Sequence, residues 1–472
     1  MAINKISELW KMNASEIVQL VKERKVSCRE TVQAHIDRIK EINPGINAIT
    51  VLLEEQALDM ADNEDKKLAR GEKVLPLQGI PFTVKENIDL TGSATSLGTS
   101  TMKDKEPDED APLIVQLKEA GAIPIARTNL SEFALRPHTE NKLRGATLNP
   151  WNNYVTPGGS SGGDAVAVST GMAPLGIGND YGGSLRLPAQ LNGISTIKPS
   201  SGRVPDHLSV TQPEPLITTQ FFLAQGPLAR CIDDLKLALY NMSCYDGRDP
   251  HWTPADFFNV NIKSTVKIAA VYEPGGKKVE PEVREGIGAS AQILIDSGYT
   301  VEEIEPPSIN DAWDIYVGLT SVEKREFIMP KIPFFDSEKT ASFIKYWTEL
   351  IPGQELHTYM NSLAQRKRIA REWSLFMEEF PLIIGPVSTM TTLPVDFDVK
   401  DMETVNTYLD SCKFMIIANL LGLPSVVVPV GIKNGAPLAV QIIGPKFFED
   451  LCLDAARCIE NKVGSITPIT PL

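Results

Sequence analysis

The 472-residue sequence predicts an α/β fold, because stretches typical of strands and of helices alternate along much of its length. Near residue 120, a predicted helix at 110–120 is followed by a short apolar strand at 123–126. Further along, predicted strands at 268–272 and 299–304 flank a predicted helix at 283–296. Such alternation is typical of helices packed in layers against a sheet.

Length alone would suggest about three domains, but no linker rich in proline, glycine or serine divides the chain. We therefore expect one domain spanning residues 1–472. The formal net charge of −14 argues against nucleic acid or an anionic membrane surface as a partner. The N-terminus has no apolar signal core, and no run approaches the roughly 18 apolar residues of a membrane helix.

Six cysteines are scattered along the chain without a Cys-x-x-Cys pair, which argues against a zinc site. Unpaired thiols in a chain of this length suit a reducing compartment. We therefore expect a cytoplasmic protein without a bound metal, present as a monomer or a homodimer.

Two helices are expected between residues 13 and 42. The second should begin with a capping box, in which the side chains of Ser27 and Glu30 bind each other's backbone N–H groups. Asn43-Pro44-Gly45 should end that helix, and a charged, exposed helix follows at 54–73.

The apolar run from residue 76 to residue 84 predicts a buried strand, and Lys85 would emerge at its end inside the protein. Burial disfavours the ammonium form, so the pKa of Lys85 should lie below the ordinary value near 10.4. A decrease of about three units would leave a usable general base near neutral pH.

The composition changes near residue 305, and from there to about 380 we expect a helical segment rich in large aromatic residues. Some of these side chains should line an apolar cleft. The remaining predicted elements are a helix from Leu130, an amphipathic helix at 226–239, a helix at 415–421, and strands at 380–385, 425–430 and 438–444.

The most distinctive stretch, residues 156–205, contains two glycine-flanked serines, Ser160 and Ser184, that are 24 residues apart. Ser160 lies in Gly-Gly-Ser-Ser-Gly-Gly, and Ser184 lies in Asp-Tyr-Gly-Gly-Ser. Small side chains between them predict a short packed helix followed by a buried strand. Glycines beside a serine let a substrate approach closely, and consecutive N–H groups in such a loop can bind a negative oxygen.

Three other interpretations of this stretch compete. A flexible linker is disfavoured because apolar, small-residue packing sequence follows at once. A phosphate-binding loop lacks the closing Lys-Ser or Lys-Thr pair, and the third glycine of a dinucleotide fingerprint is missing. A nucleophile elbow matches G-x-S-x-G at Ser160 and Ser161, but the preceding residues form a poor strand ending in proline, and no histidine lies in a recognisable motif.

The block from Gly158 to Pro205, with its Gly-Asn-Asp-Tyr-Gly-Gly-Ser-Leu-Arg-Leu-Pro-Ala run, resembles the amidase signature family. The segment Gly-Ile-Pro-Phe-Thr-Val-Lys-Glu at 79–86 is similar to the lysine-bearing strand of that family, so the core motif spans 79–205. The resemblance implies a mixed central β-sheet covered by helices on both faces (α/β/α). It also implies a variable, mostly helical region, here about 305–380, that shapes the substrate pocket.

The resemblance implies a Ser–Ser–Lys triad in place of a Ser–His–Asp triad. Ser184 would be the nucleophile, Ser160 would relay protons through a loop with a cis Gly159–Ser160 peptide bond, and Lys85 would be the general base. The oxyanion hole would consist of four backbone N–H groups, those of Tyr181, Gly182, Gly183 and Ser184. This chemistry requires no metal and no organic cofactor.

Other residues are expected to support the site. Asp180 and Arg186 flank Ser184, and we expect them to pair and hold the loop. Thr128 and Asn129 resemble a Thr-Asn turn of the family near the site, and Ser161 should supply a supporting hydrogen bond.

Two departures from the family pattern bear on the substrate. Asn179 and Tyr181 stand where the family more often has threonine, and Gln190-Leu191-Asn192 replaces its usual Ala-Phe-Cys. Neither departure touches the triad. We expect a serine amidohydrolase that cleaves C–N bonds of bulky, apolar small molecules. The substrate would be an amide, including nylon oligomers, or a carbamate (urethane). The alternatives are a glutamine-hydrolysing subunit of an aminoacyl-tRNA amidotransferase and a non-catalytic binding relative.

Overall fold

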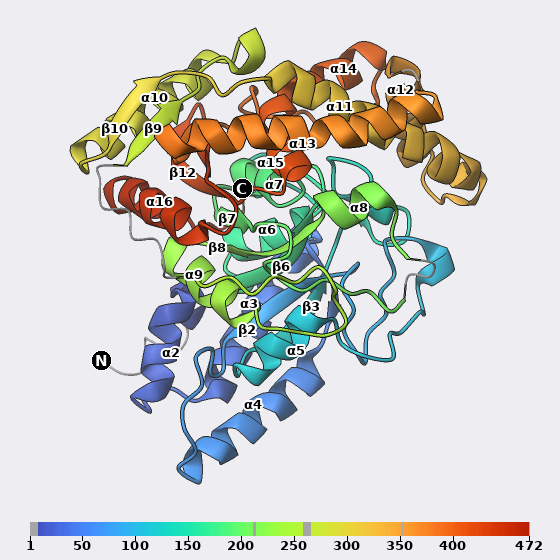
Figure 1. Ribbon diagram of the computed structural model, residues 1–472. Helices are drawn as coiled ribbons and strands as arrows, with labels where there is room; N and C mark the ends of the chain where they lie inside the picture. Colours follow the sequence, from blue (N-terminus) through green and yellow to red (C-terminus); the bar gives the residue numbers. More distant parts are fainter. Residues whose placement is uncertain (1–7, 211–213, 258–265, 352, 472) are drawn as a thin grey trace.

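The structure, a computed structural model, describes residues 8–210, 214–257, 266–351 and 353–471 (Figure 1). Within these residues, eleven strands form one mixed sheet in the order β1-β3-β2-β6-β8-β7-β12-β13-β11-β9-β10. The strands are β1 (Ile49–Leu52), β2 (Pro81–Lys85), β3 (Ile123–Thr128), β6 (Leu175–Asp180), β7 (Ser195–Lys198), β8 (Ala224–Ala229), β9 (Lys267–Ala270), β10 (Thr300–Glu303), β11 (Leu382–Pro386), β12 (Ser425–Lys433) and β13 (Ala436–Ile443). A small ribbon pairs β4 (Glu140–Asn141) with β5 (Gly145–Ala146).

The direction of the strands explains how distant parts of the sequence meet. Strands β3, β2 and β6 are parallel neighbours, so their carboxyl ends lie along the same edge of the sheet. Antiparallel pairing then continues from β6 through β8, β7, β12 and β13 to β11, and β11, β9 and β10 are parallel. Lys85 ends β2 and Asp180 ends β6, so both halves of the core motif reach the edge where α/β sheets bind ligands.

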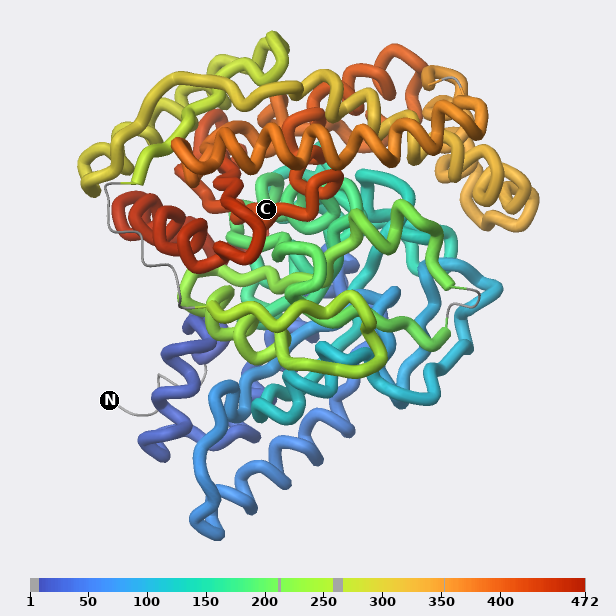
Figure 2. The backbone as a smooth tube through the Cα atoms, in the orientation of Figure 1, coloured from blue at the N-terminus to red at the C-terminus, as the bar shows by residue number. Residues whose placement is uncertain are grey.

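Helices cover both faces of the sheet. One face is covered by α2 (Ala14–Lys22), α3 (Cys28–Ile46), α4 (Glu54–Ala69), α5 (Pro112–Glu119), α9 (Ile232–Asn241), α10 (Pro281–Asp296) and α16 (Glu449–Val463). The other is covered by α7 (Arg186–Asn192), α8 (Ile217–Phe222), α11 (Ile309–Glu323), α12 (Glu338–Leu350), α13 (Leu356–Glu379), α14 (Met402–Ser411) and α15 (Lys413–Leu421). Helix α6 (Gly162–Ser169) contributes side chains to both cores. In Figure 2 the N-terminal part lies below, the central residues lie in the middle, and the yellow-to-orange segment lies above.

The buried hydrophobic side chains form two clusters, one on each face of the sheet. In β12, Val426 and Val428 belong to one cluster, whereas Val427 belongs to the other. Successive side chains of a strand point to opposite faces, so this strand is buried on both sides. The predicted α/β fold, with a mixed sheet between two helical layers, is therefore confirmed.

Most predicted elements are present, and their bounds differ in ways that have physical causes. The capping box of Ser27 and Glu30 is confirmed, but α3 continues through Pro44 and ends before Asn47, whose backbone is left-handed. A proline in the last turn removes a single helical hydrogen bond, which the helix tolerates. The predicted buried strand at 76–84 is shorter, because β2 begins only at Pro81.

Two predictions about helices were wrong. The helix expected from Leu130 is a short 3-10 turn at Glu132–Ala134, because Phe133 and Ala134 have positive φ angles of 52° and 58°. The first part of the helix expected at 226–239 is strand β8, and the helix α9 begins only at Ile232. The short strands β1 and β7 and the helices α7, α14 and α16 were not predicted.

The segment at 305–380 is helical, as predicted. It consists of α11, a π-helical turn at Lys324–Ile328, a 3-10 segment at Met329–Phe334, α12 and α13. Figure 1 shows α11, α12 and α13 together on the upper side of the sheet. In the part of the chain that the structure describes, none of the helices combines the length and apolarity needed to span a bilayer.

Candidate active site

Lys85 is the last residue of β2, and its side chain is fully buried. Its Nζ atom donates hydrogen bonds of 2.8 Å to Ser160 Oγ and of 2.8 Å to the side-chain oxygen of Asn179. The structure thus brings the predicted lysine and the first predicted serine into direct contact. Because β2 pairs with β6, Lys85 also lies beside the segment that leads to Ser184.

Burial lowers the pKa of Lys85 to about 7, although the carboxylates of Asp164 and Asp180 favour its charged form. Asp164 is itself buried, which raises its pKa to about 6 against hydrogen bonds from the hydroxyl groups of Thr128 and Thr83. A lysine with such a pKa is partly deprotonated at neutral pH, as a general base must be.

Ser160 lies in a tight loop that leads into α6. Its peptide bond to Gly159 is cis, as the resemblance implied. A Cβ atom at Gly159 would lie 2.6 Å from the carbonyl oxygen of Arg136, and one at Gly158 would lie 2.7 Å from Pro188. The loop therefore packs so closely against its neighbours that both positions require glycine.

Ser184 follows β6 in a loop and is half-buried. Its carbonyl oxygen accepts a hydrogen bond of 3.3 Å from the backbone N–H of Ser161, which joins the loops of the two predicted catalytic serines. The Ser184 hydroxyl makes no hydrogen bond to any described residue, so it remains available to a substrate.

The loop from Tyr181 to Ser184 presents backbone donors. The N–H groups of Tyr181, Gly182 and Ser184 have no hydrogen-bond partner among the described residues. The N–H of Gly183 is different, because it donates a 2.7 Å hydrogen bond to Asp180 Oδ1. Gly183 has a φ of 104°, and a Cβ there would lie 2.7 Å from the sulfur of Met415. Three of the four predicted oxyanion donors are therefore free, and the fourth holds the loop.

Asp180 and Arg186 form the expected pair, and both are fully buried. The guanidinium donates to both carboxylate oxygens, at 3.0 and 3.1 Å, and also to the side chains of Asn419 and Gln441 and the carbonyl of Met415. Burial alone would raise the pKa of Asp180, but Arg186 and Asn419 hold it below its ordinary value. This network fixes both ends of the Ser184 loop.

The predicted supporting residues lie around the site. Thr128 donates to Asp164, and the side chain of Asn129 donates to Gly145 O and Thr147 Oγ1, both at 3.0 Å. Within the described residues, neither makes a hydrogen bond to a member of the predicted triad. Ser161 Oγ donates to the carbonyl oxygen of Asn179 at 3.3 Å, the supporting bond that was expected.

Comparison with known proteins agrees with this arrangement. Residues 30–453 match the family model described as Amidase. The chain is 38% identical over 460 residues to an indoleacetamide hydrolase of Bradyrhizobium diazoefficiens, covering 97% of this chain and 87% of that protein. The chain is a member of the amidase signature family.

Two further relatives of this amidase show how widely the family varies. The chain is 30% identical over 486 residues to a glutamyl-tRNA(Gln) amidotransferase subunit of Carboxydothermus hydrogenoformans, covering 96% of this chain and 98% of that one. The solved structure of 6-aminohexanoate cyclic dimer hydrolase in complex with substrate has a TM-score of 0.82 at 22% identity, covering 97% of this chain and 98% of that one. At that identity the match shows the shared fold. As a family member, the protein is a hydrolase acting on C–N bonds.

Sequence reasoning missed several contacts in this amidase. Asn179 was noted as a departure from the family pattern, but not as a partner of Lys85. The Tyr181 hydroxyl contacts Thr218 on α8, and Thr218 in turn donates to Glu323 at the end of α11. Only the unusual residues at 179 and 181 could have drawn attention to these contacts, because Thr218 and Glu323 lie in no motif.

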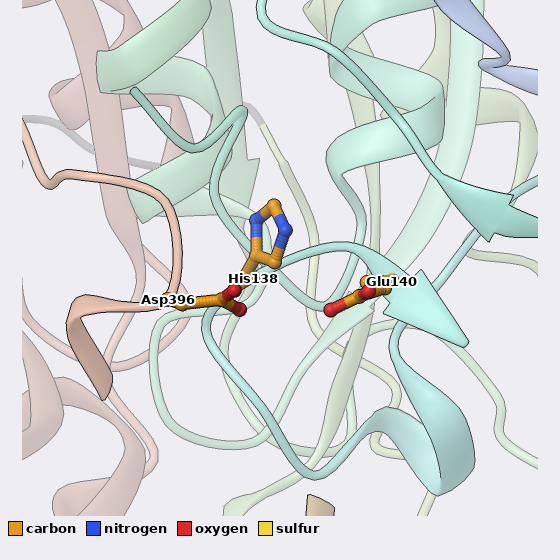
Figure 3. Close-up of side chains that lie close together, drawn as sticks. All are labelled: His138, Glu140 and Asp396. Atoms are coloured by element: carbon orange, nitrogen blue, oxygen red, sulfur yellow. The ribbon is translucent and has the colours of Figure 1, made fainter. Parts of the chain in front are cut away.

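One group of metal-type ligands occurs among the described residues: His138, Glu140 and Asp396, whose candidate ligand atoms lie within 4.8 Å of one another. Figure 3 shows Asp396 and Glu140 flanking the His138 side chain. Lys339 Nζ lies 2.7 Å from Asp396 and 3.0 Å from Glu140, and Arg136 pairs with both carboxylates. Because two cations already neutralise these carboxylates, the arrangement indicates an ion-pair cluster.

Proposed function

We propose that this amidase hydrolyses bulky, apolar small-molecule amides or carbamates, with Ser184 as nucleophile, Ser160 as proton relay and Lys85 as general base. The observation that supports the proposal best is the 2.8 Å contact between Lys85 Nζ and Ser160 Oγ at a fully buried lysine. A charged lysine could not accept a proton, and burial lowers the pKa of Lys85 to about 7. The same residues in a merely structural role would not need a neutral amine.

In the proposed reaction, the three residues act in sequence. Ser184 Oγ attacks the carbonyl carbon while its proton passes to Ser160 Oγ, and the Ser160 proton passes to Lys85 Nζ. The lysine proton then returns through Ser160 to the leaving nitrogen, and the C–N bond breaks to give an acyl-enzyme ester and a free amine. Water repeats the sequence at the ester, releasing a carboxylic acid (from a carbamate, a carbonic acid derivative) and restoring Ser184.

The negative oxygen of each tetrahedral intermediate requires donors. The unpartnered N–H groups of Tyr181, Gly182 and Ser184 are suited to this role. The family resemblance implied the N–H of Gly183 as a fourth donor. In the structure this N–H donates to Asp180 and so holds the loop. We propose an oxyanion hole built from the three free groups.

The acyl side of the site favours a flat, apolar group. The Tyr181 ring lies 5.9 Å from Phe222 and 6.2 Å from Tyr316 between ring centroids. The Tyr181 hydroxyl is bound by Thr218, so the half-buried ring can offer only carbon atoms to a substrate beside it. Together with the similarity to an indoleacetamide hydrolase, this supports a primary amide of an arylacetic acid as the first substrate to test.

Glutamine hydrolysis as part of an aminoacyl-tRNA amidotransferase is the second candidate. The similarity to a glutamyl-tRNA(Gln) amidotransferase subunit supports it. The aromatic cluster of Tyr181, Phe222 and Tyr316 opposes it, because a glutamine side chain carries a charged amino acid group beyond the amide. A non-catalytic binding relative is disfavoured because Lys85, Ser160 and Ser184 are all present.

Hydrolysis of a substrate panel tests the proposal. The panel contains indole-3-acetamide, a p-nitroanilide, an aryl carbamate, a nylon-type oligoamide and glutamine, each with the wild-type protein and with Ser184→Ala. A matched control is Ser201→Ala, which removes another half-buried serine that donates to Phe221 O. Release of an amine or ammonia from the apolar substrates, lost only in Ser184→Ala, supports the proposal. Ammonia from glutamine alone favours the amidotransferase function, and activity that survives Ser184→Ala refutes the mechanism.

A further inference from the structure

Lys85 has a second hydrogen-bond partner besides Ser160. The side-chain oxygen of Asn179 accepts from Lys85 Nζ at 2.8 Å, the same distance as Ser160 Oγ. Asn179 is buried and belongs to β6, where its backbone pairs with Gln225 of β8. The amide therefore faces the amine from a strand that is paired on both sides, near the carboxyl edge of the sheet.

A neighbouring asparagine fixes the orientation of that amide. Asn87 Nδ2 donates to Asn179 Oδ1 at 3.2 Å, and Asn179 Nδ2 donates to Asn87 Oδ1 at 3.2 Å. This reciprocal pair would be broken if the Asn179 amide rotated by half a turn, because two NH2 groups and two oxygens would then face each other. Lys85 Nζ and Asn87 Nδ2 both donate to Asn179 Oδ1, so these two contacts together hold the oxygen of Asn179 toward Lys85.

The consequence for the proton path follows from which atoms can donate. A neutral lysine amine has two N–H bonds and one lone pair, an amide oxygen can only accept, and a hydroxyl can do both. One N–H of the amine must therefore point at Asn179. This leaves the lone pair free to turn toward the hydroxyl proton of Ser160.

We propose that Asn179, locked by Asn87, is a positioning residue that turns the lone pair of the Lys85 amine toward Ser160. This inference rests on the proposed function, since it concerns the same proton relay. It also assigns a role to Asn179, one of the two positions at which the family more often has threonine. A threonine side chain at 179 is shorter by one atom and lacks the amide that pairs with Asn87.

Other charged groups near Lys85 also influence the pKa of its amine. Asp164 on α6 and Asp180 at the end of β6 both favour the charged amine. From β3, Arg127 donates to the backbone carbonyl of Lys85 at 3.2 Å, and the adjacent Glu86 is paired with Arg144. None of these groups is altered by a substitution at 179, so any change in the titration of Lys85 reports the lost or altered amide.

When kcat/KM is plotted against pH, activity should rise at the pH where Lys85 loses its proton, and we call this rise the acid limb. Two substitutions at position 179 should move the acid limb in opposite directions. Asn179→Asp places a carboxylate against the amine, which favours the charged form and should move the limb up by about one pH unit or more. Asn179→Leu has a similar shape but offers no acceptor, so the limb should move down by roughly half a unit to one unit. In both, kcat on the plateau should fall about tenfold to a hundredfold, with KM nearly unchanged, because the amine is no longer held in place.

Additional variants separate positioning from folding. Asn179→Thr introduces the residue that the family more often has, so the fold should accept it, and its limb should also move down. Asn87→Ala frees the amide of Asn179 to rotate and should lower kcat. The acid limb should move by less than it does in Asn179→Leu. The matched controls Asn141→Asp and Asn141→Leu alter another buried asparagine, which donates to Asn129 and Leu130 O. They should lower stability and leave the limb at its wild-type position.

A direct titration makes the outcome independent of catalysis. The Lys85 side-chain amine is followed by NMR in protein labelled at the lysine side chains, and its signal is assigned by its loss in Lys85→Met. Opposite movements of this titration in Asn179→Asp and Asn179→Leu support the inference, even if no amide on the panel is hydrolysed and the proposed function fails. Limbs and titrations that stay at the wild-type pH in both variants, or that move in the same direction, overturn it.

Discussion

The hydroxyl oxygens of Tyr181 and Thr218 lie 2.7 Å apart, and the direction of this hydrogen bond is determined by a third residue. Thr218 donates its single hydroxyl proton to the carboxylate of Glu323, which also accepts from the Thr218 N–H at 3.0 Å. Thr218 can therefore only accept from Tyr181. Tyr181, the first residue of the proposed oxyanion loop, is thus anchored through Thr218 to the C-terminal end of α11.

This direction predicts unequal effects of removing the two hydroxyl groups. Thr218→Val leaves the Tyr181 hydroxyl without its acceptor and removes one of the three hydrogen bonds that the Glu323 carboxylate accepts, so it should reduce the free energy of unfolding by about 1–3 kcal/mol. Tyr181→Phe removes the donor and leaves the Thr218–Glu323 bond intact, so its effect should be smaller. Urea denaturation measures both, and kcat/KM should fall more in Thr218→Val, because the ring is no longer anchored.

Tyr359→Phe is the control for this pair. Tyr359 donates to Glu323 at 2.9 Å and makes no hydrogen bond to Tyr181. It should reduce stability while kcat/KM stays within about twofold of wild type, as is usual for a change away from the reacting groups. Equal losses of kcat/KM in all three variants would contradict the assigned direction.

The protonation state of Lys85 should determine the pH dependence of the reaction. Its amine must be neutral to accept a proton, and its pKa is about 7 because the side chain is buried. Activity should therefore be low at acid pH and should rise through about pH 7 to a plateau. The measurement is kcat/KM between pH 5 and 10. Lys198→Met is a matched control, because Lys198 is also buried and also has a pKa of about 7, yet its Nζ donates to Pro199 O. This variant should keep the acid limb, whereas a limb that vanished with Lys198 would contradict the assignment.

The same lysine should lower the stability of the fold at neutral pH. Between pH 7 and 10.5 the unfolded chain keeps the Lys85 proton that the folded chain has lost. The unfolded state thus binds more protons, so the free energy of unfolding should increase with pH across this window, by up to about 5 kcal/mol. Lys85→Met should remove this part of the slope and be more stable than wild type at pH 7, while being inactive. Parallel stability curves for the two proteins would show that the lysine proton is retained on folding.

Gly183→Ala should inactivate the protein. The glycine has a φ of 104°, and a Cβ there would press into the side chain of Met415. The loop must move, so kcat should fall by about a hundredfold or more as the oxyanion donors lose their alignment. Gly435→Ala is the control, because Gly435 also has a positive φ of 77° but open space around it. It should lower stability by about 1 kcal/mol through backbone strain and leave kcat unchanged.

Local patterns in the sequence predicted the alternating elements, and the resemblance to the amidase signature family implied the contact of Lys85 with Ser160. They failed where the answer depends on tertiary structure. The helix expected from Leu130 is stopped by two left-handed residues, Phe133 and Ala134, which no single-residue preference indicates. Strand β7 has four residues, too few for a periodic signal, and is defined by its pairing with β12 and β8. Thr218 and Glu323 are 105 residues apart, and only the packing of α8 near α11 brings them together.

The anchoring of Arg186 limits how the protein could be divided. A fragment ending at residue 400 would contain Lys85, Ser160 and Ser184, and hence the whole diagnostic motif. It would lack Met415, Asn419 and Gln441, which accept three of the hydrogen bonds that Arg186 donates. It would also expose the edge of β7 that β12 covers. The motif that identifies the family is therefore not a minimal enzyme: its geometry is completed by residues more than 200 positions downstream, so truncated forms should retain the motif and lose the site.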